Sequence, residues 1–297
     1  MIGYALNFMN EIGFDKEAID SLSNDLKKIY ADDTSRKMFE ECIAEYTRNV
    51  HTDCTALREK ADAAGERVGV HKYSAELLMF ICFSKHLREL YRENGIYDSV
   101  WFDSMCDLKW KLWECKLVKG IWGSFVTWWF PRWFDMTRFA LGRLQFEIVE
   151  FRCDGNFEKD GKILHDGDEV INVHIPRTTT PIDKASRDDA YARAREFFKD
   201  RIKNTPMAFV CSSWLLYPEA LDFLPEKSNI RGFMADYTII RSSTDNEGEY
   251  PSMWKLFDMS YTGNVDDYPD DTSLRRAYKE HLKKGGKTGS GYGVFFA

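Results

Sequence analysis

Hydrophobic residues in the first 120 positions or so recur at steps of three and four, which is the period of an amphipathic helix. Three such runs are Ala18, Leu22, Leu26 and Ile29; Phe39, Cys42, Ile43 and Tyr46; and Leu77, Leu78, Ile81 and Cys82. Glycines and polar pairs separate the runs, and no proline precedes Pro131. The pattern predicts a bundle of five or six helices, and we assign residues 1–133 to this domain.

After Pro131 the hydrophobic period changes from helical to alternating. In the segment LGRLQFEIVEF, Leu144, Phe146 and Ile148 alternate with polar residues, which predicts a half-buried strand. The segment EVINVHIP places Ile171, Val173 and Ile175 on one face of a second strand, with Asn172 and His174 on the other.

The rest of the chain reads as further strands and helices. Residues 187–203 predict a helix that starts with a capping box of Ser186 and Asp189, and MAFVCSSWLL (207–216) predicts a strand. A short helix over 218–224, strands over 230–241 and 252–257, and a helix after Asp271 follow. The terminal GYGVFFA predicts an edge strand, and the overlapping GGKTGSGYG (285–293) a mobile connector. The fold class is therefore α+β with two domains, the second being a mixed α/β sheet over residues 134–297.

Composition and charge exclude several classes of protein. The 297 residues are 44% hydrophobic and 30% charged, so the chain is neither disordered nor collagen-like. Acidic residues outnumber basic ones 48 to 41, a net charge of −7 that argues against a nucleic-acid or anionic-membrane binder. The seven cysteines include no CxxC pair, so we expect no zinc site and reduced thiols in a cytoplasmic protein. The N-terminus lacks a signal-peptide pattern, and the longest apolar stretch, 121–134, is shorter than the roughly 20 residues of a spanning helix.

His174 is the residue with the most chemical promise. It ends a predicted strand and precedes a loop and a helix, the position where ligands gather in α/β sheets. A histidine there can deprotonate a nucleophile near neutral pH, or it can bond a loop carbonyl for structural reasons, and both interpretations stay open. In the loop RTTTPIDKAS (177–186), Arg177 and Lys184 could bind an anion at the helix start, although the nearby aspartates would repel it.

Two further positions on the next predicted strand and beyond it could carry chemistry. Cys211 could pair with His174 as a nucleophile, but no GxSxG motif is present and a buried structural cysteine is favoured. Tyr217 could donate a proton to a leaving group or be an ordinary tyrosine.

Four segments, HIP (174–176), CSSWLLYP (211–218), LPEKSNI (224–230) and DTSLRRAY (271–278), resemble a bacterial family of acyltransferases. Its members join a helical N-acyltransferase N-terminal domain to a C-terminal domain like that of the GCN5-related N-acetyltransferases (GNAT). The resemblance covers most of the chain. It implies a GNAT-like sheet in which two central strands splay apart and admit the pantetheine arm of acetyl-CoA or a longer acyl-CoA.

The resemblance also implies roles for particular residues. His174 would be the general base and Tyr217 the acid for the departing thiolate. The cofactor arm would lie against residues that flank the two strand ends: Ile175, Arg177, Thr178, Thr179, Ser212, Ser213 and Trp214. We expect a small-molecule amine as acceptor and no metal.

The loop RTTTPIDKAS departs from the family pattern because it contains none of the usual glycines. This departure favours an alternative, a non-catalytic ligand-binding or interaction protein on a degenerate GNAT-like scaffold. A third possibility is a hydrolase that uses Cys211 or Ser212 with His174.

Overall fold

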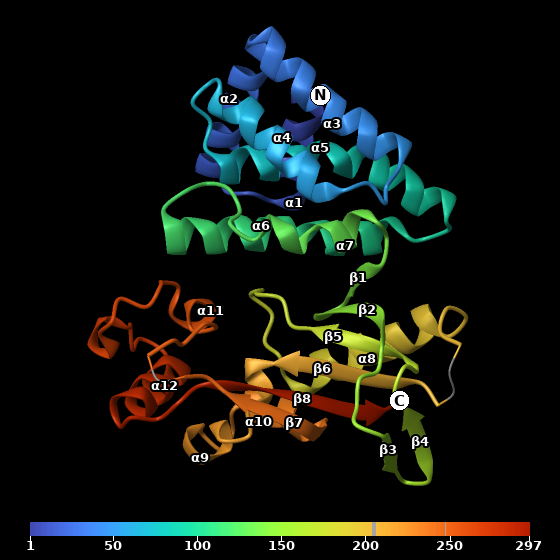
Figure 1. Cartoon of the computed structure of the whole chain (residues 1–297), viewed down its shortest axis with the longest axis vertical. Coiled ribbons are helices and arrows are strands. Elements are labelled where there is room, and N and C mark those ends of the chain that lie inside the picture. The colour runs from blue at the N-terminus through green and yellow to red at the C-terminus, as the bar shows by residue number, and fades with distance from the viewer. Residues whose placement is uncertain (204–205, 247) are drawn as a thin grey trace. The chain divides into compact units, whose positions relative to one another are not determined.

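The computed structural model describes residues 1–203, 206–246 and 248–297, which form two compact units, Met1–Phe139 and Ala140–Ala297. Figure 1 shows the first as a set of helices and the second as a twisted sheet flanked by helices. The boundary expected from the sequence, between residues 133 and 134, stays a prediction.

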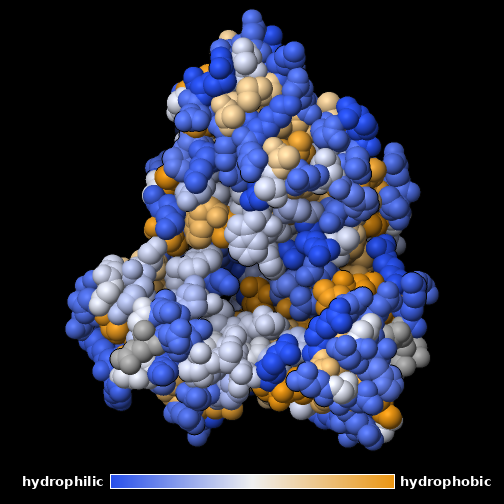
Figure 2. All heavy atoms as spheres, in the orientation of Figure 1, coloured by the Kyte–Doolittle hydropathy of each residue, from blue (hydrophilic) through white to orange (hydrophobic). Residues whose placement is uncertain are grey.

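The first unit is helical up to its last few residues, as the periodicity predicts. Its elements are α1 (Ile2–Ile12), α2 (Lys16–Ala31), α3 (Asp33–Arg48), α4 (Cys54–Glu66), α5 (Lys72–Glu93), α6 (Asp98–Lys119), a 3₁₀ turn η1 (Thr127–Trp129) and α7 (Pro131–Phe134). No helix in the described parts of the chain is both long and apolar enough to cross a membrane. On the face seen in Figure 2, hydrophilic residues cover most of this unit, and hydrophobic residues show as separate spots.

Helix α5 is the centre of the helical core. It contacts α1, α2, α3, α4, α6 and α7. Every residue from Leu77 to Phe83 is buried, as expected of a helix that is surrounded on all sides. The ring of Tyr46 stacks on that of Phe83 with 4.4 Å between centroids, and its hydroxyl donates to the carbonyl oxygen of Phe134 at 2.8 Å. These contacts fix α7 onto the bundle.

The second unit is built on a mixed six-stranded sheet in the order β1-β2-β5-β6-β8-β7. The strands are β1 (Arg138–Leu141), β2 (Leu144–Glu150), β5 (Glu169–His174), β6 (Ala208–Ser213), β7 (Thr238–Thr244) and β8 (Gly289–Phe296). A separate hairpin pairs β3 (Asn156–Lys159) with β4 (Lys162–His165). The helices are α8 (Lys184–Phe198), α9 (Ala220–Phe223), α10 (Asn229–Ala235), α11 (Trp254–Phe257) and α12 (Ser273–Lys283), with 3₁₀ turns η2 (Trp214–Leu216) and η3 (Val265–Asp267).

Both faces of this sheet bury apolar side chains. On one face the rings of Phe146, Phe209 and Phe295 pack around Tyr191 of α8. On the other face Val170, Val210 and Val294 join Phe157 and Leu164 from the β3–β4 hairpin. The sheet therefore carries a second core, which confirms the α+β fold expected from the sequence.

Several local predictions are wrong. Residues 229–235 form α10 rather than a strand, because the Ser228 hydroxyl caps the backbone N–H of Ile230 and places Ile230, Phe233 and Met234 on one buried helical face. Residues 254–257 are helical as well. Helix α8 begins at Lys184, and its cap is the Asp183 carboxylate, which accepts from the backbone N–H of Ser186 at 2.9 Å.

The last strand, β8, is central rather than an edge. It pairs antiparallel with β6 on one side and with β7 on the other. Its glycines permit close approach, since a Cβ at Gly291 would lie 2.1 Å from the carbonyl oxygen of Leu216. The glycine-rich stretch that suggests a connector is therefore a tightly packed strand from Gly289 onward.

Candidate functional site

The parallel strands β5 and β6 separate toward their C-terminal ends. Their ladder pairs Ile171 with Phe209 and Asn172 with Val210, and the described residues show no further pair beyond these. Past that point β5 pairs only with β2, and β6 with β8. Segments 173–174 of β5 and 211–213 of β6 therefore continue beyond the ladder that the two strands share, and this is where the resemblance puts the cofactor arm.

His174 lies two residues beyond the last β5–β6 pair, and its Nε2 is 2.7 Å from Oε1 of Glu147. Glu147 comes from β2, where it is paired directly with Asn172, while Gln145 is paired with His174. These four side chains therefore share one sheet face. The Asn172 amide also donates to Oε1 of Glu147, at 3.3 Å. The His174 side chain is 18% exposed and that of Glu147 is 9%, so the pair is shielded but accessible.

The hydrogen bond to a carboxylate decides which imidazole nitrogen carries the proton. Because an ionised Glu147 carboxylate only accepts, this contact assigns the proton of the neutral ring to Nε2 and the lone pair to Nδ1. The amide nitrogen of Asn172 lies 3.2 Å from the same Nε2, but it is itself a donor and its hydrogen bond goes to Glu147. A carboxylate beside the ring also stabilises the imidazolium that forms after proton uptake. An imidazole placed in this way can take up a proton while the carboxylate fixes the orientation of its ring.

The loop after β5 is held by its own side chains. Arg177 donates to the carbonyl oxygen of Lys255 at 2.8 Å and forms an ion pair with Asp258. The hydroxyl of Thr178 accepts from the backbone N–H of Thr180 at 3.1 Å, which closes a tight turn. Ile175 and Thr178 are partly buried, and Thr179 is exposed.

The other predicted cofactor residues are the last two of β6, Ser212 and Ser213, and the first of η2, Trp214. Ser212 is exposed at the end of the strand. The Ser213 hydroxyl caps η2 by accepting from the backbone N–H of Leu215 at 3.1 Å. The indole of Trp214 packs edge-on against the ring of Tyr278, 5.7 Å between centroids. The predicted cofactor residues thus gather at the C-terminal ends of β5 and β6 and in the segments that follow these ends.

Tyr217 and Cys211 occupy different surroundings from His174. The Tyr217 hydroxyl is 3.1 Å from that of Thr244, and burial raises the pKa of Tyr217, which keeps the phenol protonated. Cys211 is fully buried on the opposite sheet face from His174, because Val210 is the residue paired with Asn172. Burial raises the pKa of the Cys211 thiol far above its ordinary value. The suggested Cys211–His174 nucleophilic pair is therefore excluded, and Cys211 is a core residue.

Comparison with known proteins identifies the architecture. Residues 5–136 match the model of the N-acyltransferase N-terminal domain, and residues 139–295 match that of the GNAT-like C-terminal domain. The chain belongs to this GNAT-like family. The sequence resemblance is thereby confirmed.

Solved structures agree with this fold. A crystal structure of an acyltransferase in complex with decanoyl-CoA and teicoplanin has a TM-score of 0.75 and 20% sequence identity, and the match covers 98% of this chain and 87% of that one. An acyltransferase mutant in complex with octanoyl-CoA has a TM-score of 0.76 at 20% identity, with coverage of 98% and 87%. Comparison with curated proteins gives no match.

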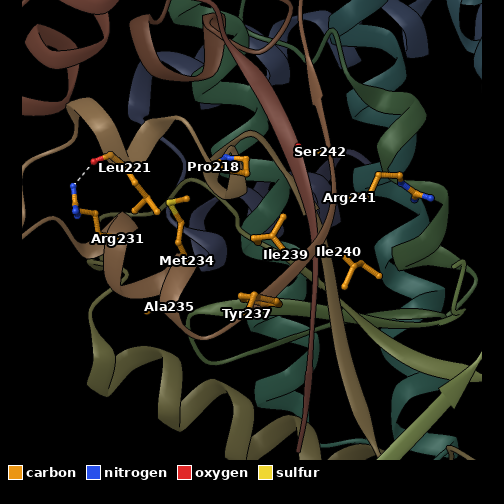
Figure 3. Close-up of a pocket in the computed structure, with 10 residues that line it drawn as sticks. All are labelled: Pro218, Leu221, Arg231, Met234, Ala235, Tyr237, Ile239, Ile240, Arg241 and Ser242. Atoms are coloured by element: carbon orange, nitrogen blue, oxygen red, sulfur yellow. Dashed lines mark hydrogen bonds between the residues drawn. The ribbon is translucent and has the colours of Figure 1, made fainter. Parts of the chain in front are cut away.

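The GNAT-like unit also has a surface pocket, which does not include the ends of β5 and β6. It has a volume of about 590 Å³ and follows the outer edge of β7 beside α9 and α10, as Figure 3 shows. The residues that line it include no histidine, cysteine or carboxylate. Its Arg231 donates to the carbonyl oxygen of Leu221 at 2.6 Å. The pocket contains none of the predicted cofactor residues, so we keep the candidate site at the ends of β5 and β6.

Sequence reasoning missed Glu147 and Asn172 as site residues of this GNAT-like unit. The signal was present, because both predicted strands carry a polar face and both polar faces reach the same end of the sheet. No group of three or more His, Cys, Asp or Glu residues in the described parts of the chain is arranged to hold a metal ion.

Proposed function

We propose that this protein is an N-acyltransferase that moves an acyl group from an acyl-CoA thioester to a small-molecule amine. The observation that carries the proposal is the end of the β5–β6 ladder at Asn172 and Val210, with a histidine–carboxylate pair directly beside it. Membership of the GNAT-like family and the fold shared with acyltransferases support it.

The proposed reaction forms one bond and breaks one. The thioester arm hydrogen-bonds to the backbone between Ile175 and Thr179 and to that of Ser212, Ser213 and Trp214, with the Arg177 side of the loop at its outer end. The amine nitrogen attacks the thioester carbonyl, whose developing charge a backbone N–H stabilises. The carbon–nitrogen bond forms, and the carbon–sulfur bond then breaks.

Two side chains of this chain manage the protons. His174 takes the proton of the attacking amine at Nδ1, and Glu147 stabilises the imidazolium through Nε2–H. Tyr217 gives its proton to the departing thiolate, since the raised pKa of this buried phenol means that it carries its proton at neutral pH. The protons balance, because the amine loses one to His174 and the thiolate gains one from Tyr217. After the products leave, His174 returns its proton to water and Tyr217 takes one up.

The class of acceptor and the cell compartment are part of the proposal. The acyltransferase of similar fold was crystallised with teicoplanin, and we propose a small-molecule amine acceptor here as well. Its relatives hold decanoyl-CoA and octanoyl-CoA, so medium-chain thioesters are tested alongside acetyl-CoA. The seven cysteines are free thiols, which fits a reducing compartment, and we place the protein in the cytoplasm.

Isothermal titration of the purified protein with acetyl-CoA, octanoyl-CoA and decanoyl-CoA tests the proposal. We expect saturable heat with at least one thioester and, in the presence of a panel of amines, release of free CoA detected with a thiol reagent. The proposal fails when no thioester binds.

A non-catalytic binding protein on the same scaffold is the second candidate. Two features of the β5–α8 loop favour it. The loop lacks glycine, and its two cations already form ion pairs, Arg177 with Asp258 and Lys184 at the start of α8 with Asp188. It predicts thioester binding without turnover, and His174→Ala and Tyr217→Phe variants that leave any cellular phenotype intact.

A further inference from the structure

The turn between β1 and β2 carries an arginine, Arg143, that forms hydrogen bonds with the loop between β5 and α8 (175–183). Arg143 donates through Nε to the carbonyl oxygen of Thr180 at 2.7 Å and through Nη1 to that of Pro176 at 2.9 Å. A guanidinium has five N–H groups, so these two bonds leave three for another acceptor. Arg143 itself is only partly buried.

Arg143 differs from the other cations around this loop because its charge is not balanced by a carboxylate of the described residues. The structure gives it no carboxylate partner within ion-pair distance in the described parts of the chain, whereas its neighbours form ion pairs. These are Arg177 with Asp258, Lys184 with Asp188, and Arg187 with Asp236. Desolvation lowers the pKa of Arg143 to about 10, as expected for a shielded cation without a counter-ion. A bound anion would relieve this cost.

The loop offers little else to an anionic ligand. It has no glycine, so its backbone has no special freedom to wrap a phosphate. At the start of α8 the Asp183 carboxylate already accepts from the backbone N–H of Ser186. An anion at this end of the opening therefore needs a charged side chain that is not already neutralised.

We propose that the Arg143 guanidinium binds a phosphate oxygen in the nucleotide part of the acyl-CoA. The inference rests on the proposed function, and it names the residue whose positive charge would bind the phosphates of the cofactor. The acyl chain and the pantetheine arm carry no charge, so the phosphates are the anionic groups that a cation beside the loop can bind. Bidentate guanidinium–phosphate contacts suit the planar donor set.

A comparison of two thioesters isolates this contact. Dissociation constants are measured by titration for octanoyl-CoA and for octanoyl-pantetheine, which lacks the phosphates. Arg143→Ala should weaken octanoyl-CoA binding roughly 10- to 100-fold and octanoyl-pantetheine binding by a much smaller factor, which reflects the two lost bonds to the loop carbonyls. Arg152→Ala is the matched control, since Arg152 is an exposed arginine beyond the opposite end of β2, and it should bind both as the wild type does.

Arg143→Gln separates charge from loop shape, because glutamine keeps an N–H donor for a loop carbonyl but has no charge. It should show the same selective loss as Arg143→Ala, and it replaces that variant if alanine prevents folding. An unchanged affinity for octanoyl-CoA, or an equal loss for both thioesters, overturns the phosphate contact. A wild-type protein that binds neither thioester overturns the proposed function and this inference together, which is a different result.

Discussion

Both units of the molecule bury glutamates, and two of these, Glu147 and Glu76, have opposite kinds of neighbour. Glu147 in the sheet is 7% exposed and Glu76 in the helical unit is 8% exposed. Glu147 accepts hydrogen bonds from the ring of His174 and the amide of Asn172. Glu76 also accepts, from the hydroxyl of Thr127, but a second carboxyl group, that of Asp62, lies beside it.

The pair in the helical unit has little positive charge to offset it. The charges of Lys72 and, more weakly, Arg58 favour the ionised form of Asp62, and Nη1 of Arg58 is 4.0 Å from Oε2 of Glu76. Oδ1 of Asp62 is buried without a hydrogen-bond donor. Burial first, and the charge of Glu76 second, raise the pKa of Asp62 to about 7. Near neutral pH these two acids therefore hold a proton that a solvated pair would have lost.

The comparison shows that burial alone does not set the role of a carboxyl group. Next to an imidazole at a strand end, the charge of Glu147 stabilises a protonated base, which is useful during proton transfer. Next to another acid inside a bundle, the charge of Glu76 opposes ionisation of its neighbour and costs stability. The partner decides the role, and each of the following experiments changes one partner.

The largest effect is expected when the base is removed from the sheet site. His174→Ala should lower kcat/KM for acyl transfer by roughly 10²- to 10⁴-fold, because the attacking amine then has only water to take its proton. The dissociation constant for octanoyl-CoA should stay close to that of the wild type. His165→Ala is the control, since His165 is exposed on β4 and bonds Asn156 instead. A variant at position 174 that keeps nearly full activity would make the histidine structural.

A smaller effect is expected when only the charge beside the base is removed. Glu147→Gln keeps the side-chain size but no longer favours the imidazolium, so kcat should fall about tenfold with KM little changed. For the same reason the acidic limb of the pH–rate profile should move to lower pH. Glu150→Gln, at the exposed end of the same strand, should change neither quantity. Loss of activity without movement of that limb would assign Glu147 a purely structural role.

Much of the fold can be predicted from the sequence, because most elements bury one clear face. The helical period over residues 1–120 and the alternation in β2 and β5 follow directly from such faces. The failures occur where tertiary contacts decide. Gly291 reads as part of a connector, yet it is glycine because the carbonyl oxygen of Leu216 passes too close for a Cβ. Nothing local in the sequence shows that contact.

The candidate site is predictable in part, for a related reason. His174 stands out because it is a titratable residue at the end of a strand, and alternation gives the face on which it lies. Glu147 does not stand out, since a polar residue on a half-buried strand usually faces water. Its role depends on register, which places Gln145 across from His174 and Glu147 one step along the same face. Register is set by the whole sheet, so a single strand cannot reveal it.

The smallest effect is expected at the acid pair of the helical unit, where the change should appear as a pH dependence of stability. The ordinary pKa of an aspartate, 3.8, applies to Asp62 in the unfolded chain, and in the folded protein this pKa is raised to about 7. The folded state therefore binds the proton more tightly than the unfolded state does. The contribution of Asp62 to stability is therefore largest at acidic pH and is lost as the pH rises from about 4 to about 7. Asp62→Asn cannot ionise and escapes this loss. Its Tm relative to the wild type should be higher at pH 8 than at pH 5, by roughly a few degrees.

Thermal unfolding followed by circular dichroism at both pH values measures this difference, with Asp33→Asn as the control. Asp33 lies in the same unit with a side chain that is 89% exposed, so its replacement should shift Tm by the same small amount at both pH values. If Asp62→Asn also behaves in that way, Asp62 is ionised in the folded protein and the two acids do not hold a proton between them. The contrast with Glu147 would then lie in the hydrogen-bond donors of each glutamate, because charge would no longer distinguish the two sites.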